Sequence, residues 1–367
     1  MADTPISPLI ARARIPSRTN RLNRTEINFL KAMIGTTLIV FIFWVGYYIE
    51  RNVLHRPPES IRFIREASEA AMRYITIPHV IIGFMFMWSS PKNQSRGKRA
   101  WIFGLLALGA VLSTLYGMGG GKTNVILYLG VYLAFLVHEL RDEAMFYTIL
   151  GDAPPIKDRV VFGKMVTTLI ALMVAAMACL VWALVPFGVY RAKTTIHESA
   201  LFDGSLSLIA KVLLSAVPMM AVAGGFHVTL KRSAARLGYA NVTTLVQTHA
   251  TLFRVMIGVV SVLGLALLIV QRPYALILFH VVAWYIFASH QLTKHPPKIA
   301  TKGVWLWMRT TVTGFRTLHI GMALVLMAIG LVWTLVLGQT PYLSWLLSPE
   351  AFLYWTIMHI TVSFVPR

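Results

Sequence analysis

The sequence predicts an all-helical integral membrane protein, a polytopic bundle of about ten transmembrane helices. The composition is the first reason, because 57% of the 367 residues are hydrophobic and only 13% are charged, whereas soluble domains carry about 25% charged residues. The second reason is that about ten apolar runs can cross a bilayer core, which takes roughly 20 helical residues. The third is that basic and charge-poor connections alternate between these runs.

The expected spans follow one another without a dividing segment. They are approximately Phe29–Tyr48, Met72–Ser90, Trp101–Gly117, Val125–Leu140, Met165–Phe187, Ser205–Phe226, Thr251–Val270, Pro273–Leu292, Thr317–Leu337 and Ala351–Val365. Prolines inside three of them are tolerable, because neighbouring groups in a bundle satisfy the carbonyls that a proline frees. The sequence shows no internal repeat and no low-complexity region. We therefore expect residues 29–367 to form a single helical transmembrane domain.

Charge predicts the orientation of the bundle. Residues 1–28 form a basic tail, and the basic connections alternate with charge-poor ones, so the positive-inside rule places both termini in the cytoplasm. The expected location is the cytoplasmic (inner) membrane of a bacterium. The net charge of +20 is scattered through the connections without an aromatic-interleaved basic face. Anionic lipid headgroups, and no nucleic acid, are therefore the expected partners.

Histidines recur inside the apolar runs, where imidazole is costly without a partner. Counting about 1.5 Å per residue from the expected helix ends places one set in a layer near the cytoplasmic face. This set is His138, His227, His249, His290 and His319, with His359 close by. Unrelated helices have no packing reason to carry imidazoles at one level, so the layer predicts a metal site. The competing interpretation is a belt of interfacial histidines bonded to carbonyls or headgroups.

The segment HELRDE at residues 138–143 adds carboxylates to this layer. If the helix continues through it, His138 and Asp142 share a face at i, i+4 spacing. Imidazole and carboxylate together suit iron, manganese or zinc, so we add Asp142 to the expected ligands. Glu143 and Tyr285 are expected to orient the metal ligands without binding the metal themselves. Alternatively the helix ends here, and the arginine of the segment pairs with a neighbouring acid.

Two more histidines, His79 and His280, are expected at comparable depth in the outer half of the bilayer. A haem iron takes one axial imidazole from each side of the porphyrin. This pair is therefore the alternative cofactor site, for haem b. Aromatic and small residues nearby suit a flat macrocycle, and they suit ordinary packing equally well.

Three fragments are similar to the carotene-cleaving dioxygenases associated with bacteriorhodopsin genes. They are the tripeptide IPH at residues 77–79, His138 two helices later, and the pair Ser289-His290. The chain departs from that family's pattern at residues 80–82, which read VII where its first motif continues with Gly and Asp. Its second closely spaced histidine after Ser-His is also absent. The resemblance covers these fragments only, and no residue role is carried over from it.

The sequence thus predicts a histidine-rich membrane metalloprotein with non-haem iron, an oxidoreductase or oxygenase acting on a lipid-soluble substrate. It contains no GxSxG, HExxH or CxxC motif, so hydrolase and redox-thiol chemistry have no support. One alternative is a haem-b electron carrier that uses His79 and His280 and exchanges electrons with quinone. Another is a non-enzymatic transporter or pigment-binding subunit of a membrane complex, docked through its basic tail. At this point enzyme, electron carrier and complex subunit all stay open.

Overall fold

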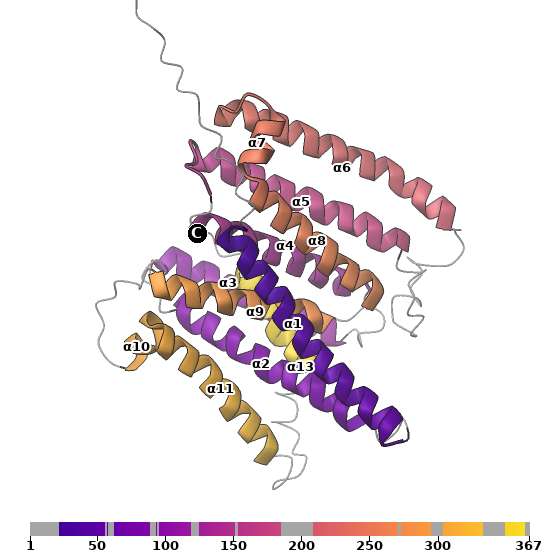
Figure 1. The fold of residues 1–367 in the computed structure, drawn as a ribbon, viewed down its shortest axis with the longest axis vertical. Helices are drawn as coiled ribbons and strands as arrows, with labels where there is room; N and C mark the ends of the chain where they lie inside the picture. Colours follow the sequence, from indigo (N-terminus) through magenta and orange to yellow (C-terminus); the bar gives the residue numbers. More distant parts are fainter. Residues whose placement is uncertain are drawn as a thin grey trace, which may run out of the picture.

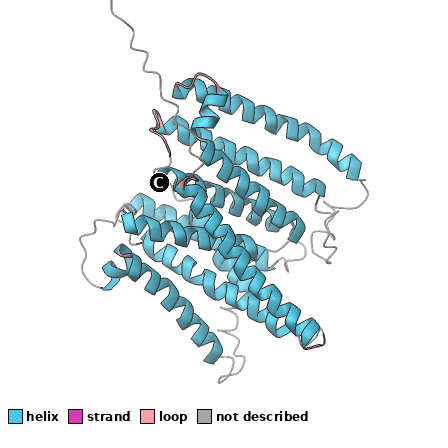
Figure 2. Ribbon diagram, viewed as in Figure 1, coloured by secondary structure: helices cyan, strands magenta, loops and turns pink. Residues whose placement is uncertain are grey.

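The computed structural model describes residues 22–55, 57, 62–88, 93, 95–118, 125–150, 153–184, 208–270, 273–294, 304–332 and 349–363. These residues are almost entirely helical, and none of them forms a strand (Figure 2). The helices run roughly alongside one another in one elongated bundle (Figure 1). The predicted all-helical class is therefore confirmed. Residues 1–21 of the predicted basic tail lie outside the described part of the chain.

Each segment predicted as a span overlaps a helix in the described part of the chain. The elements are α1 (Arg24–Tyr48), η1 (Ile49–Val53), α2 (Arg62–Trp88), α3 (Arg96–Met118), α4 (Val125–Ile149), α5 (Arg159–Leu184), α6 (Leu208–Leu237), α7 (Val242–Thr248), α8 (Ala250–Val270), α9 (Pro273–Lys294), α10 (Val304–Thr310), α11 (Val312–Val332) and α13 (Pro349–Ser363). Within the described ranges, four helices are long and apolar enough to cross a membrane, namely α3, α5, α6 and α11. The pair α7 and α8, bent by 82° at a short break, makes a fifth if it is one span. The predicted number of about ten spanning helices is therefore not confirmed.

The shortfall has a physical cause, because several of the other helices are short or carry polar residues. The apolar parts of α2 and α9 are limited to Tyr74–Trp88 and Ile277–Thr293, and α13 has only 15 residues. The acids of the HELRDE segment lie in the middle of α4. Such helices are too short or too polar to count as membrane spans by length and hydropathy, although a bundle can bury their polar groups in its interior.

Three of the helices that could cross a membrane, α3, α6 and α11, each expose several large apolar side chains. α5 and α6 lie at one end of the bundle and α11 at the other (Figure 1). α6 exposes Ile209, Leu213, Val217 and Met220 along one face. A continuous exposed apolar face of this kind suits lipid contact and would be unfavourable in water.

α4 lies inside the bundle, where it contacts α5, α8, α9 and α13. It continues to Ile149, so the segment 138–143 is mid-helix and the expected helix end near Leu140 is wrong. α13 packs closely on α3, because a Cβ added to Gly109 would lie 3.0 Å from the Cα of Met358. A small residue at a helix contact allows this approach of the backbones. These contacts fix α4 and α13 around a common interior point.

Candidate metal centre

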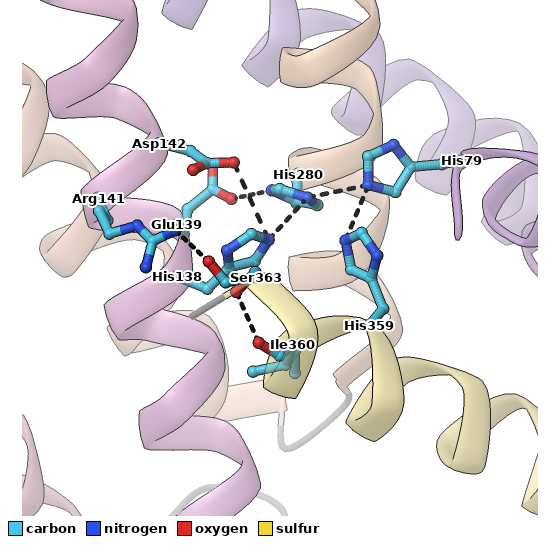
Figure 3. Close-up of polar contacts among 9 residues, drawn as sticks. All are labelled: His79, His138, Glu139, Arg141, Asp142, His280, His359, Ile360 and Ser363. Atoms are coloured by element: carbon cyan, nitrogen blue, oxygen red, sulfur yellow. Dashed lines mark hydrogen bonds and ion pairs between the residues drawn. The ribbon is translucent and has the colours of Figure 1, made fainter. Parts of the chain in front are cut away.

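Four helices each bring one histidine to this interior point (Figure 3). The Nε2 atom of His280 on α9 lies 3.1 Å from Nε2 of His79 on α2 and 3.3 Å from Nε2 of His138 on α4. The Nε2 atom of His359 on α13 lies 3.2 Å from that of His79. We call these four residues the histidine cluster. Their corresponding ring nitrogens therefore face one another inside the protein.

The spacing of these nitrogens fits the coordination shell of a metal ion. With a metal–nitrogen distance of about 2.0–2.1 Å, neighbouring ligand nitrogens lie roughly 2.8–3.4 Å apart, from the octahedral to the tetrahedral arrangement. The three measured separations, 3.1, 3.2 and 3.3 Å, fall in this range. Two overlapping ligand groups occur, His79 with His280 and His359, and His138 with Asp142 and His280. The cluster is thus compatible with metal binding.

Glu139 determines which nitrogen of His280 carries the proton. Its Oε2 atom lies 2.5 Å from Nδ1 of His280, and both side chains are buried. A carboxylate accepts a hydrogen bond from Nδ1–H, so the lone pair of His280 is left on Nε2 and points into the cluster. Metal-ligating histidines commonly donate their other N–H to a carboxylate in this way. His280 is therefore already held in the tautomer that a metal requires.

Hydrogen bonding alone cannot satisfy all three nitrogen–nitrogen contacts. A hydrogen bond between two imidazoles needs one N–H and one lone pair. If His280 offers a lone pair, then the single hydrogen on Nε2 of His79 has to serve both His280 and His359. A cation would remove the conflict, because the nitrogens of either ligand group could then present lone pairs to it.

Buried carboxylates on the α4 side of the cluster favour a positive charge there (Figure 3). An oxygen of Asp142 lies 4.0 Å from Nε2 of His138. Glu139, Asp142 and Glu143 are each no more than 5% exposed. Burying carboxylates is expensive unless a counter-charge or hydrogen bonds compensate. A bound divalent cation would supply this compensation.

Neighbouring residues hold the cluster in place. Arg141 of α4 donates a hydrogen bond to the carbonyl of Ser363 at the end of α13 (Figure 3), where the helix dipole favours a positive charge. Gly83, one turn after His79, leaves room for His359, because a Cβ at this position would lie 3.4 Å from the imidazole Cε1. α2, α4 and α13 are thereby kept in register around the cluster.

Aromatic rings line the cluster and keep its surroundings apolar. The Phe135 ring centroid lies 5.6 Å from that of His280 and 6.2 Å from that of His138. The Trp284 ring packs edge-on against His79 at a centroid distance of 4.5 Å. Such a lining excludes water and strengthens electrostatic interactions at the site.

The structure regroups the histidines that the sequence had divided by depth. It brings His138 and His359, expected in the inner layer, together with His79 and His280, expected in an outer pair. His138 and His280, which the sequence analysis assigned to different depths, are in contact through their Nε2 atoms, 3.3 Å apart. The count assumed that α4 ends near Leu140, whereas the continued helix places His138 near its middle.

The other histidines expected as ligands are not members of the cluster. His227 is exposed on α6. His290 is half-buried on α9, ten residues beyond His280 and hence about 15 Å farther along the helix. His319 is buried on α11 against Tyr285, with ring centroids 5.5 Å apart. These residues are not brought together with the four clustered imidazoles.

His249 forms a separate constellation at the bend between α7 and α8. Its Nδ1 lies 3.0 Å from the Tyr147 hydroxyl, and its Nε2 lies 2.8 Å from the Tyr239 hydroxyl. A neutral imidazole donates at one nitrogen and accepts at the other, so both nitrogens are satisfied. Burial raises the pKa of Tyr239, which lies in the connection after α6. We call His249, Tyr147 and Tyr239 the His249 site.

Sequence reasoning gave Glu139 little weight as a site residue, and the structure makes it a direct partner of His280. The available signal was an acid in the middle of an apolar run, which needs a buried partner. Comparison of the chain with models of known protein families, with curated proteins and with solved structures finds no match. The geometry of the histidine cluster is therefore the basis for the proposed function.

Proposed function

We propose that this chain is a membrane metalloprotein whose histidine cluster binds one metal ion. Our proposal for the metal is iron, and for the activity an oxidoreductase or oxygenase reaction on a lipid-soluble substrate. The observation that carries the proposal is a continuous series of four Nε2 atoms from four separate helices, with consecutive separations of 3.1–3.3 Å. Imidazole ligands suit iron, and an iron site with open positions supports oxygen chemistry.

Different residues would bind the ion, orient its ligands and supply negative charge at such a site. Either of the two overlapping ligand groups, His79 with His280 and His359 or His138 with Asp142 and His280, would hold the ion. Glu139 keeps the proton of His280 on Nδ1. Asp142, beside His138, adds negative charge that raises the affinity for a cation. When bound, a redox-active ion supplies one-electron chemistry that the side chains lack. The exposed apolar helices around the cluster favour a substrate that arrives from the lipid.

Axial ligation of haem by His79 and His280 is less well supported. Two axial nitrogens on opposite sides of an iron, each at about 2.0 Å, lie roughly 4 Å apart with the porphyrin plane between them. Here the two nitrogens are 3.1 Å apart. Two further imidazoles flank the pair, with Nε2 of His138 3.3 Å from that of His280 and Nε2 of His359 3.2 Å from that of His79. This geometry favours a single ion over a macrocycle.

The test is to purify the protein gently and measure bound metals by mass spectrometry together with the absorption spectrum. We expect near-stoichiometric iron and no Soret band. His280→Ala should lose the metal, and His227→Ala is the matched control because His227 is exposed on α6. His359→Gln provides a second, milder ligand variant if His280→Ala does not fold. Wild-type metal content in both cluster variants would reject the assignment, and a Soret band would reject the non-haem site.

A further inference from the structure

A fifth buried imidazole lies beside the histidine cluster and belongs to His319 on α11. Its side chain is 6% exposed, and neither ring nitrogen makes a hydrogen bond of normal geometry to another described residue. The backbone carbonyl of Phe315, one turn earlier, interacts with the ring and can serve one nitrogen at most. Buried polar groups are normally hydrogen-bonded. A bound ligand could supply the missing hydrogen-bond partner of His319.

Three aromatic side chains surround His319. The ring centroid of Phe315 lies 4.7 Å from that of His319, and those of Trp284 and Tyr285 each lie 5.5 Å away. Phe315 and Tyr285 are stacked at a centroid distance of 5.6 Å. We call these four residues the aromatic cage. Aromatic walls with one polar group favour a flat ring ligand that carries a hydrogen-bonding atom.

The cage is connected to both the cluster and the lipid. The Trp284 ring contacts His79 of the cluster on one side and His319 on the other, at centroid distances of 4.5 and 5.5 Å. α11 is one of the four helices long and apolar enough to span a membrane, and it exposes Ile320 and Leu324. A ligand in the cage would therefore come from the bilayer and lie one aromatic ring away from a cluster ligand.

We propose that the aromatic cage binds the head group of a lipid-soluble quinone, with His319 hydrogen-bonded to one of its ring oxygens. The inference rests on the proposed function and names a ligand class for it. A neutral imidazole can donate to the carbonyl of a quinone and accept from the hydroxyl of a quinol, so one residue serves both forms. The flat head group would pack against the aromatic rings beside His319, and the apolar tail would extend toward the lipid side of α11.

The experiment uses duroquinone and durene, which have the same methylated ring with and without the two carbonyl oxygens. Duroquinone has no free ring position, so it does not arylate the free thiol of Cys179. Binding is measured by equilibrium dialysis of the full chain in lipid nanodiscs, with empty nanodiscs as the control for partition into lipid. We expect saturable binding of duroquinone to the wild-type protein. His319→Phe should weaken duroquinone binding about tenfold, the effect of one lost hydrogen bond, and should leave durene unchanged.

Two further variants make the result specific. His319→Gln keeps a donor and an acceptor and should bind duroquinone within about threefold of wild type. His227→Phe makes the same chemical change at an exposed site on α6 and should have no effect. The proposal is overturned if wild-type binding does not saturate, if His319→Phe binds duroquinone as wild type does, or if it loses both ligands equally.

Metal content is measured on the same samples to separate this inference from the proposed function. Wild-type metal content without saturable duroquinone binding would reject the quinone site alone. Saturable duroquinone binding that depends on His319, in a protein that retains no metal, would reject the metal function alone.

Discussion

In the histidine cluster, imidazole nitrogens lie 3.1–3.3 Å from other imidazole nitrogens, whereas at the His249 site each ring nitrogen faces a tyrosine hydroxyl. His138 and His280 of the cluster and His249 of the second site are buried. α4 contributes to both constellations, through His138 and Glu139 to the first and Tyr147 to the second. The imidazoles of the cluster lack enough hydrogens to satisfy one another. The imidazole of His249 has a complete set of partners.

The difference shows that burial of a histidine does not identify a metal ligand. A tyrosine hydroxyl can donate and accept, so it completes the hydrogen bonding of a neutral imidazole. A second imidazole does so only if their tautomers are complementary, and the three contacts within the cluster cannot all be satisfied in this way. Counting donors and acceptors therefore distinguishes the cluster, where a cation would resolve the conflict, from the His249 site, where tyrosine hydroxyls complete the hydrogen bonding.

Among the variants that test the contrast between the cluster and the His249 site, Glu139→Gln is expected to have the largest effect, a loss of metal affinity. The glutamine amide can still accept the Nδ1–H of His280, but it removes a buried negative charge beside the cluster. Loss of such a carboxylate partner typically costs 10–100-fold, or about 1.4–2.7 kcal/mol, in metal affinity. Competition of the purified protein with a fluorescent metal chelator measures the change.

The control for Glu139→Gln is Tyr147→Phe, which alters the His249 site from the same helix. It should leave the metal affinity unchanged, since both nitrogens of His249 are engaged by tyrosines. Equal losses of metal affinity in the two variants would mean that α4 acts as one structural unit, and that the distinction between the two constellations does not hold.

The sequence was sufficient for the helices, because an apolar run in a membrane chain has to satisfy its backbone internally. It also pointed to histidine as the residue type of the candidate site. The sequence could not show which histidines meet, since a count of depth needs the positions of the helix ends. The charged segment 138–143 resembled a helix end, but α4 continues past it. Nor could it give the order of helices around the bundle, which alone decides that α2, α4, α9 and α13 face one another.

Tyr147 and Tyr239 illustrate the same limit. The polar run that ends in His249 resembled an interfacial segment, and nothing in its pattern named the two hydroxyl partners. One comes from 102 residues earlier in the chain and one from ten residues earlier. A side chain that is satisfied by tertiary contacts leaves no periodic signal in the sequence, so hydrogen-bond partners had to come from the structure.

A smaller effect, on stability alone, is expected from Tyr147→Phe. The substitution removes a fully buried hydroxyl and leaves Nδ1 of His249 without its partner. An unsatisfied buried polar group costs about 1–3 kcal/mol. The free energy of unfolding, measured by denaturant titration in mixed micelles, should fall by this amount while the metal content stays constant.

The smallest effect is expected from Tyr239→Phe at the other nitrogen of His249. Tyr239 is only partly buried, so water can take the place of its hydroxyl, and the net loss of one hydrogen bond costs about 0.5–1.5 kcal/mol. The same unfolding titration compares it with Tyr147→Phe, and the double variant tests whether the two tyrosines act through one imidazole. Because one donates to the ring and the other accepts from it, the two effects should be non-additive. Strict additivity would mean that the tyrosines stabilise the bend between α7 and α8 independently, and that His249 is not the link between them.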